Sequence, residues 1–333
     1  MEFLKALRKE PTSKTPVWLM RQAGRYMKVY RELREKHSLL ELVQNPELAC
    51  EVTLQPIRAF QLDAAIIFSD ILPILGTLGL KLDFVKGEGP VLENPIRTSN
   101  QIKSLEPRDL EESIGSTLKA IRLVKPELKV PLIGFSGAPF TLACYAIEGS
   151  SSREHRLAKT LMYSKPEAWH QLMSILTKLT AQYLKAQAAA GADVLQIFDS
   201  WVGALGPAEY RLFVLPHLQK LVEQVRETGK PVIYFSTGTA GYLDLVAEVG
   251  ADAYSVDWRV SLQRAHRQLG VQKPIQGNLD PLALLAPWDV LKKQIDQVVE
   301  QAPETGYVFN LGHGILQQTP EDQVRRLTDY LKV

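Results

Sequence analysis

The sequence predicts an α/β protein folded as a single-domain (β/α)8 TIM barrel over residues 1–333. Two observations predict this fold: eight short apolar runs recur along the chain, and longer helical patterns lie between them. Near-continuous apolar runs are typical of strands that are buried on both faces of a parallel sheet. Eight such strands alternating with helices favour a closed barrel over an open sheet. Because such barrels commonly span about 200 to over 400 residues, the chain length requires no second domain.

The predicted strands are short and rich in β-branched and aromatic residues, as strands usually are. In chain order they are Val17–Met20, Ala64–Phe68, Pro131–Phe135, Val194–Phe198, Val232–Phe235, Ala253–Val256, Pro274–Gln276 and Tyr307–Leu311. In a barrel of this type the active site lies at the C-terminal ends of the strands. We therefore expect functional residues directly after these runs.

Two helix starts are predicted by a capping side chain that precedes a proline. Asn45-Pro46 and Thr319-Pro320 both place a polar side chain before a residue that suits the first helical position. A third helix is predicted over Glu167–Ala190, with Ser164 as its cap. Gly191 follows this helix and is expected to end it.

Two segments are longer than simple connections need to be. Ile71 to Glu106 is rich in Gly and Pro, and Glu148 to His155 is rich in Gly and Ser. Long connections in compact domains often carry function. We expect both to be loops at the rim of the active site.

The composition excludes several classes of protein. Lys and Arg number 39 against 37 Asp and Glu, so a net charge of +2 offers no broad field for nucleic acid or a membrane. The longest apolar stretch, 64–80, contains Asp70 and Pro73 and is a poor membrane span. Cys50 and Cys144 have no metal-ligand spacing and no disulfide framework. We expect a reduced, cytoplasmic protein without a metal.

Polar residues follow the apolar runs at almost every position. They are Arg21 with Arg25, Ser69 with Asp70, Ser136, Asp199 with Ser200, Ser236, Asp257, Asn278 and His313. So regular an arrangement exceeds what a solvated surface requires. The sequence therefore predicts a polar site where the strands end.

Arg21 and Arg25 are four residues apart, so a helical turn there would point both guanidiniums the same way. Arginine binds carboxylates through a planar fork of donors, which suits a ligand with several carboxylates. The same spacing also suits two surface arginines that pair with Glu32 or Glu35.

Asp70 follows an apolar strand that contains no other charge. An ionised carboxylate there would lose several kcal/mol of hydration unless donors or a cation replaced the water. A macrocycle with inward pyrrole N–H groups could supply these donors. Asp70 could equally cap the next helix or pair with Arg21.

His313 lies between two glycines, which let a ligand approach the backbone closely. The turn is not a dinucleotide site, because Gln317 stands where that motif needs Gly or Ala. Tyr145, expected on the helix after the third strand, and Ser200 are further hydroxyl donors for a carboxylate. Ser200 lacks the Gly-x-Ser-x-Gly elbow of serine hydrolases.

These residues lie in motifs that resemble those of the uroporphyrinogen decarboxylase family. The resemblance rests on PVWLMRQAGRY at 16–26, AAIIFSDIL at 64–72, GFSGAPFT at 134–141, QGNLDP at 276–281 and NLGHG at 310–314. The five motifs are in order along nearly the whole chain. Two segments, 148–155 and 236–241, match less closely, so no site residue is taken from them.

The resemblance implies a homodimer of single-domain barrels, with neither metal nor organic cofactor, that converts uroporphyrinogen to coproporphyrinogen in haem and chlorophyll biosynthesis. It implies that Arg21 and Arg25 hold substrate carboxylates and that Asp70 binds the pyrrole N–H groups. Further polar contacts would come from Tyr145, Ser200 and His313. The proton donor is left open between Arg21, a water held by an arginine and a substrate acid.

Two other functions compete with this prediction. A cobamide-dependent methyltransferase of related fold would need a His-x-Cys zinc site with a later cysteine, and neither Cys50 nor Cys144 follows such a histidine. A tetrapyrrole carrier would bind the same ligand without turnover. A metal assay tests the first alternative, and counting the carboxyls of the product tests the second.

Overall fold

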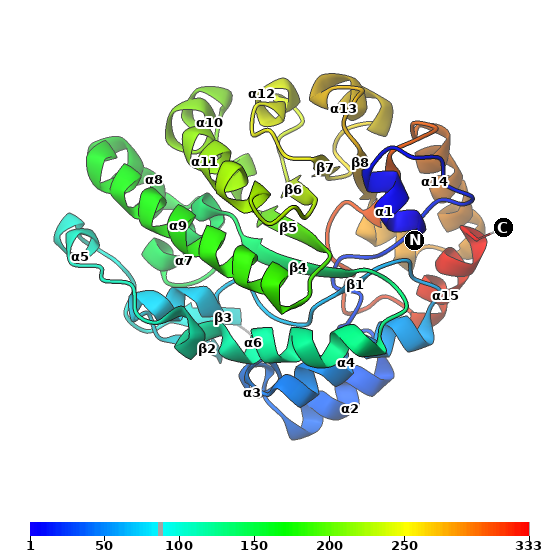
Figure 1. Cartoon of the computed structure of the whole chain (residues 1–333). Coiled ribbons are helices and arrows are strands. Elements are labelled where there is room, and N and C mark those ends of the chain that lie inside the picture. Colours follow the sequence, from blue (N-terminus) through cyan, green and yellow to red (C-terminus); the bar gives the residue numbers. More distant parts are fainter. Residues whose placement is uncertain (86–88, 333) are drawn as a thin grey trace.

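The computed structural model describes residues 1–85 and 89–332, and a curled parallel sheet lies at its centre (Figure 1). Seven strands of the described residues form this sheet in chain order, and every neighbouring pair is parallel. They are β1 (Ala65–Ile66), β4 (Leu132–Gly137), β5 (Val194–Asp199), β6 (Val232–Ser236), β7 (Ala253–Val256), β8 (Ile275–Leu279) and β9 (Tyr307–Leu311). The predicted α/β class is therefore confirmed.

Helices surround the sheet on its outside (Figure 1). Those before β1 are α1 (Glu2–Leu7), α2 (Lys28–Lys36), α3 (Leu39–Gln44) and α4 (Pro46–Ala59). Those that follow are α6 (Leu110–Val124), α7 (Pro139–Glu148), α8 (Arg156–Ser164), α9 (Pro166–Ala190), α10 (Pro207–Phe213), α11 (Leu215–Arg226), α12 (Leu243–Ala247), α13 (Leu262–Leu269), α14 (Trp288–Glu300) and α15 (Glu321–Tyr330). Short 3-10 helices are η1 (Pro73–Leu78), η2 (Lys125–Glu127), η3 (Val202–Ala204) and η4 (Pro281–Leu285).

The first predicted strand, Val17–Met20, is not a strand in the structure. Val17 makes one isolated parallel bridge to Phe309 of β9. On the other side, its carbonyl accepts a hydrogen bond of 2.7 Å from Asp63 N–H, just before β1. The ladder cannot extend to Met20, because Met20 N–H donates to the Asn310 side chain instead. This segment therefore lies between the two edge strands without forming a regular ladder with either.

The segment 71–106 contains more structure than the sequence predicted. It forms η1, a hairpin of β2 (Leu82–Val85) and β3 (Gly89–Leu92), and the helix α5 (Ser99–Lys103). A Thr98 capping box starts α5. The second predicted rim loop is short, since residues 149–155 simply connect α7 to α8.

The predicted helix boundaries are correct at one start and at one end. The Asn45 side chain accepts a hydrogen bond of 2.9 Å from Leu48 N–H at the start of α4, as predicted. Gly191 ends α9 with a φ of 127°, in agreement with the sequence. The predicted cap by Ser164 is wrong, because its hydroxyl donates to Thr160 C=O within α8. The predicted cap by Thr319 is also wrong, since α15 begins at Glu321 after Pro320.

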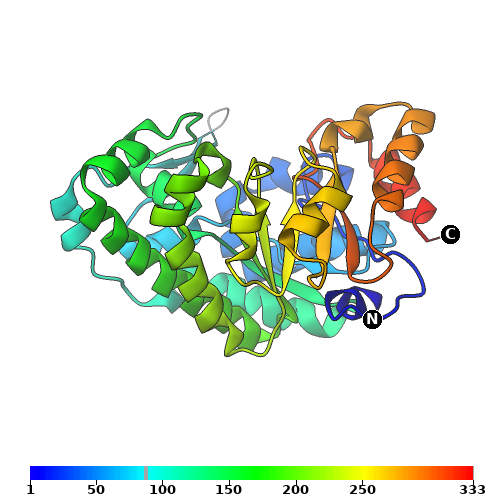
Figure 2. The same ribbon diagram turned by 90° about the horizontal axis from the view of Figure 1, so that it is seen from above.

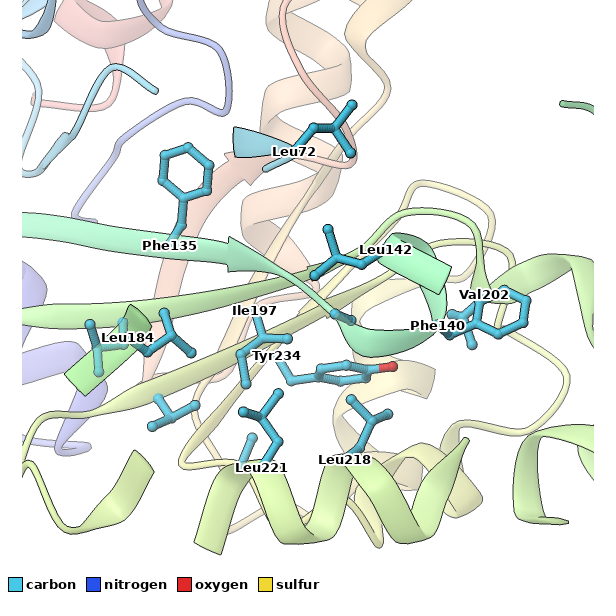
Figure 3. Packing of buried hydrophobic residues seen from close by; sticks show 14 of the residues in the cluster. Leu72, Phe135, Phe140, Leu142, Leu184, Ile197, Val202, Leu218, Leu221 and Tyr234 are labelled. Atoms are coloured by element: carbon cyan, nitrogen blue, oxygen red, sulfur yellow. The ribbon is translucent and has the colours of Figure 1, made fainter. Parts of the chain in front are cut away.

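Apolar side chains pack on both faces of the sheet. On the outer face, Ile197 and Tyr234 point toward Leu218 and Leu221 of α11 (Figure 3). This outer layer is the larger of the two cores, because it includes the inward faces of the surrounding helices. Two-sided burial explains why the strands read as continuous apolar runs.

The inner core is smaller and closes one end of the sheet. Residues near the starts of the strands, such as Ile133, Val194 and Ile233, pack there with Trp18. Phe3 and other residues of α1 belong to the same cluster, so α1 covers the amino ends of the strands (Figure 2). The carboxyl ends of the strands are not covered by α1, and polar residues lie there.

No helix within residues 1–85 and 89–332 is long and apolar enough to cross a membrane. Cys50 and Cys144 are both free thiols, and Cys144 is buried in α7.

Candidate active site

Arg21, Asp70, Tyr145 and His313 lie together at the carboxyl ends of the strands. Asp70 follows β1, Tyr145 lies on α7 directly after β4, and His313 follows β9. Arg21 follows the segment that bridges to β9. The charge of Arg21 affects the pKa of each of the other three side chains, which brings them into one electrostatic site. The sequence prediction that these residues share one end of the sheet is therefore supported by their placement.

Arg21 owes its position to an unusual backbone and to a glycine opposite it. Its φ is 60°, in the left-handed region that non-glycine residues rarely adopt. A Cβ atom added at Gly314 would lie 2.3 Å from Arg21 Cδ, so only glycine leaves room for the arginine stem. Gly314 therefore seats Arg21 beside His313.

Asp70 is a half-buried carboxylate with few protein donors. Its Oδ1 accepts a hydrogen bond of 2.9 Å from Leu72 N–H. Burial raises the pKa of Asp70 above its ordinary value of 3.8, and the N–H of Leu72 and the charge of Arg21 oppose this rise. The alternative that Asp70 is the N-cap of the next helix is wrong, because the N-cap of η1 is Leu72. Asp70 and Arg21 form no direct ion pair within the described part of the chain.

Tyr145 is fixed by an aromatic stack. Its ring lies 3.8 Å from that of Trp201, with an interplanar angle of 28°. The His155 ring packs on the same indole at 4.6 Å. Burial, and then the negative charge of Asp70, raise the pKa of the Tyr145 phenol, so the phenol is a hydrogen-bond donor at neutral pH.

His313 is held as a neutral imidazole. Burial, and then the positive charges of Arg21 and Arg259, lower the pKa of His313 to about 4. Its Nδ1 accepts a hydrogen bond of 2.8 Å from Gly314 N–H, which places the ring proton on Nε2. His313 is therefore a neutral donor next to a guanidinium.

Arg25 and Ser200 are less closely integrated into this site. Residues 21–27 form turns and bends, so the helical turn that would align Arg25 with Arg21 is absent. Arg25 is exposed, and its Nη1 lies 3.4 Å from Gln317 Oε1. Ser200 is half-buried after β5, and its carbonyl accepts a hydrogen bond of 2.7 Å from the Thr237 hydroxyl. The alternative of ion pairs with Glu32 or Glu35 is not found for Arg21 or Arg25 in the described ranges.

Comparison with known families identifies the chain. The family model described as "Uroporphyrinogen decarboxylase (URO-D)" matches residues 1–333. The chain belongs to the uroporphyrinogen decarboxylase family. The predicted family, and with it the prediction of a carboxy-lyase enzyme, is confirmed.

Relatives over the full length carry the same family name. A protein from Chloroflexus aurantiacus named "Uroporphyrinogen decarboxylase" is 53% identical over 336 residues, which cover 99% of this chain and 95% of that protein. One of the same name from Thermus thermophilus is 49% identical over 331 residues, which cover 99% of this chain and 97% of that protein.

Solved structures that are more distant in sequence share the fold. A methyltransferase from Methanosarcina mazei has a TM-score of 0.85 at 23% identity and covers 99% of this chain and 97% of its own. A B12-independent methionine synthase from Shewanella has a TM-score of 0.58 at 9% identity, covering 88% of this chain and 89% of its own. At these identities the likeness shows the fold alone.

Three side chains near this candidate site were missed by reasoning from the sequence. Trp201 stacks on Tyr145, His155 packs on Trp201, and the charge of Arg259 acts on His313. Trp201 could have been found, because it directly follows Asp199-Ser200 at the end of a strand. His155 had no such signal, since only the fold brings 150–155 onto Trp201.

Proposed function

We propose that this chain removes the four acetate carboxyl groups of uroporphyrinogen III, giving coproporphyrinogen III and CO2 without a cofactor. The observation that carries the proposal is the convergence of Asp70, Arg21, Tyr145 and His313 where the strands end. One carboxylate with few protein donors lies there beside a guanidinium and two neutral donors. This set is complementary to a macrocycle with N–H groups at its centre and carboxylates at its edge.

The chemistry follows from the substrate. When a ring carbon beside the acetate arm gains a proton, the pyrrole becomes a cation. The bond between the arm and its carboxyl group then breaks, CO2 leaves, and the electron pair neutralises the ring by forming an exocyclic methylene. A second proton adds to this methylene to give the methyl group, and the ring carbon releases the proton that it gained. The substrate is its own electron sink, a function that a cofactor such as pyridoxal phosphate serves in other enzymes.

Asp70 stabilises the cation in this scheme. A fixed negative charge acts on the positive charge that develops on the ring, and such preorganised interactions are worth about 3 to 4 kcal/mol. The few protein donors to Asp70 leave its carboxylate available for the pyrrole N–H groups. Burial of Asp70 lowers the local dielectric and strengthens the interaction.

Arg21, Tyr145 and His313 bind the acidic arms. The guanidinium of Arg21 binds a carboxylate through two donors, and the Tyr145 hydroxyl and His313 Nε2–H each donate one hydrogen bond. Arg25 and Ser200 extend the same function at the edge of the site. Fixing the arm orients the bond that breaks relative to the ring.

The proposal includes the finer architecture and setting. The segment 16–20 closes the sheet into an eight-membered ring, which its hydrogen bonds to Phe309 and Asp63 support. The chain acts as one catalytic domain in a cytoplasmic homodimer, in haem or chlorophyll biosynthesis. Exposed Leu282 and Leu285 of η4 and Val290 of α14 offer an apolar surface for a second copy. Light scattering tests the dimer.

Anaerobic incubation with reduced uroporphyrinogen tests the activity. The expected result is successive loss of carboxyl groups, counted by chromatography of the oxidised products. Binding without loss of a carboxyl group would identify a carrier and contradict the proposal.

A methyltransferase is the second candidate, because the Methanosarcina mazei structure shares the fold. A zinc thiolate site of that kind would need a His-x-Cys pair and a later cysteine, and neither Cys50 nor Cys144 follows such a histidine. Cys144 is buried on α7, and burial raises the pKa of its thiol well above the ordinary value, which disfavours the thiolate that zinc requires. Stoichiometric zinc in the purified protein would favour this function.

A further inference from the structure

The turn that follows β7 carries a guanidinium held in a fixed position. Arg259 Nη1 pairs with Asp257 Oδ2 at 2.6 Å, and Asp257 is only 3% exposed. The same carboxylate accepts hydrogen bonds from Gly238 N–H at 2.7 Å and from Arg259 N–H at 3.0 Å. Asp257 is therefore a rigid anchor, and it holds one edge of the Arg259 guanidinium.

The part of the Arg259 guanidinium that does not contact Asp257 is held in place but is still exposed to solvent. Arg259 Cζ lies 4.2 Å from the centroid of the Trp258 ring, so the indole covers one face. The side chain is nevertheless 52% exposed. An arginine that serves only to neutralise Asp257 would not need this exposure, whereas one that binds a ligand would.

Two glycines place this turn beside the site. A Cβ atom at Gly312 would lie 2.5 Å from Trp258 N, so the turn packs directly on the end of β9. Gly314, two residues later, is the glycine that seats Arg21. His313 lies between these contacts in the chain, and its pKa responds to both arginines. The turn that carries Arg259 and the side chain of Arg21 therefore contact the two residues on either side of His313.

We propose that Arg259 binds a carboxylate of the tetrapyrrole substrate, as a further guanidinium beside Arg21 that determines affinity for the acidic periphery. This inference rests on the proposed function. Because Asp257 and Trp258 already fix the side chain, little rotamer entropy is lost when a carboxylate binds. A ligand with acidic arms around its edge needs cations at more than one point, and Arg259 provides one on the β7 side.

Two variants of Arg259 and one matched control test the proposal. Arg259→Gln removes the cation, and Arg259→Lys keeps a charge that can pair with Asp257 but removes the fork. Arg264→Gln removes an exposed arginine of α13 whose guanidinium bonds only the Gln268 side chain among the described residues. Steady-state decarboxylation is measured anaerobically against uroporphyrinogen concentration at several salt concentrations, with Tm as a check of folding.

The expected result is a change in KM with little change in kcat. Arg259→Gln should raise KM about tenfold or more, as a lost hydrogen bond to a charged group predicts. Arg259→Lys should raise KM less. Arg259→Gln should weaken the salt dependence of KM, whereas Arg259→Lys, which keeps the charge, should retain most of it. Arg264→Gln should leave KM and kcat unchanged.

Other outcomes separate this inference from the proposed function. Wild-type turnover with an unchanged KM in Arg259→Gln overturns the role of Arg259 alone. A fall in kcat at unchanged KM also overturns it, because it would indicate a structural or chemical role. If Arg259→Gln fails to fold, Arg259→Lys tests the proposal: a raised KM supports the role of Arg259, and an unchanged KM overturns it. Absence of turnover in the wild type overturns the proposed function and this inference with it.

Discussion

Asp70 and Asp199 both lie where strands of the same parallel sheet end, yet their surroundings differ. Asp199 is fully buried, and it accepts hydrogen bonds from the Thr141 hydroxyl at 2.7 Å and the Tyr234 hydroxyl at 2.8 Å. Asp70 is half-buried, and no side-chain hydroxyl within the described residues donates to it. Burial raises the pKa of both carboxyls.

The two carboxylates differ in the source of their hydrogen-bond donors. Tyr234 points toward α11, so Asp199 faces the outer core, where the protein itself satisfies both oxygens (Figure 3). Asp70 faces the end where Arg21, Tyr145 and His313 gather. A buried carboxylate that the protein satisfies is structural, whereas one that it leaves with few donors is available to a ligand. The comparison predicts that changes at Asp70 affect turnover and changes around Asp199 affect stability.

The largest effect is expected for Asp70→Ala. Loss of the charge that stabilises the ring cation should reduce kcat about 100-fold or more. Tm should not fall, because Asp70 has few protein partners to lose. Anaerobic turnover and thermal unfolding measure the two quantities. A wild-type rate would refute the role of Asp70.

A smaller loss of turnover is expected for Arg21→Lys. An ammonium replaces the charge but not the two parallel donors, so kcat/KM should fall about 10- to 100-fold. Arg25→Lys is the matched comparison and should cost less, because Arg25 lies toward Gln317. Equal losses in the two variants would contradict the separation of these arginines that the structure shows.

Asp199 should make stability depend on pH. Burial raises the pKa of Asp199 from 3.8 to about 6, so between these values the native state holds a proton that the unfolded state has released. The free energy of unfolding should therefore fall as pH rises through this range, by at most about 1.4 kcal/mol per pH unit. Urea unfolding at several pH values should show a smaller slope in Asp199→Asn. Identical slopes in the two proteins would contradict this prediction.

The smallest effect is expected for Tyr234→Phe. The change removes one donor to Asp199 and leaves the ring, so the free energy of unfolding should fall by about 1 to 2 kcal/mol. Turnover should stay close to the wild-type value, since Tyr234 faces the outer core. A large fall in kcat without a fall in Tm would contradict the prediction that the surroundings of Asp199 affect stability and not turnover.

Local signals predicted only some of the element boundaries. Asn45 caps α4 and Gly191 ends α9, because both effects depend on neighbouring backbone groups alone. Ser164 and Thr319 carry similar local signals, but Ser164 bonds within α8 and Pro320 precedes the first helical residue of α15. The hairpin of β2 and β3 was not predicted, since Gly and Pro obscure its short strands.

The amino-acid sequence by itself determined the alternation of strands and helices, the family and the residues that follow each strand. Apolar runs and motifs are properties of neighbouring residues, so a single chain displays them. Only the tertiary structure decided that Asp70 faces the site while Asp199 faces the outer core, and that the turn carrying Arg259 packs on Gly312 next to His313. The hydrogen-bond donors that surround a buried charge come from helices and strands that are distant in the chain. The packing of these elements determines which donors are present, and their order in the sequence does not.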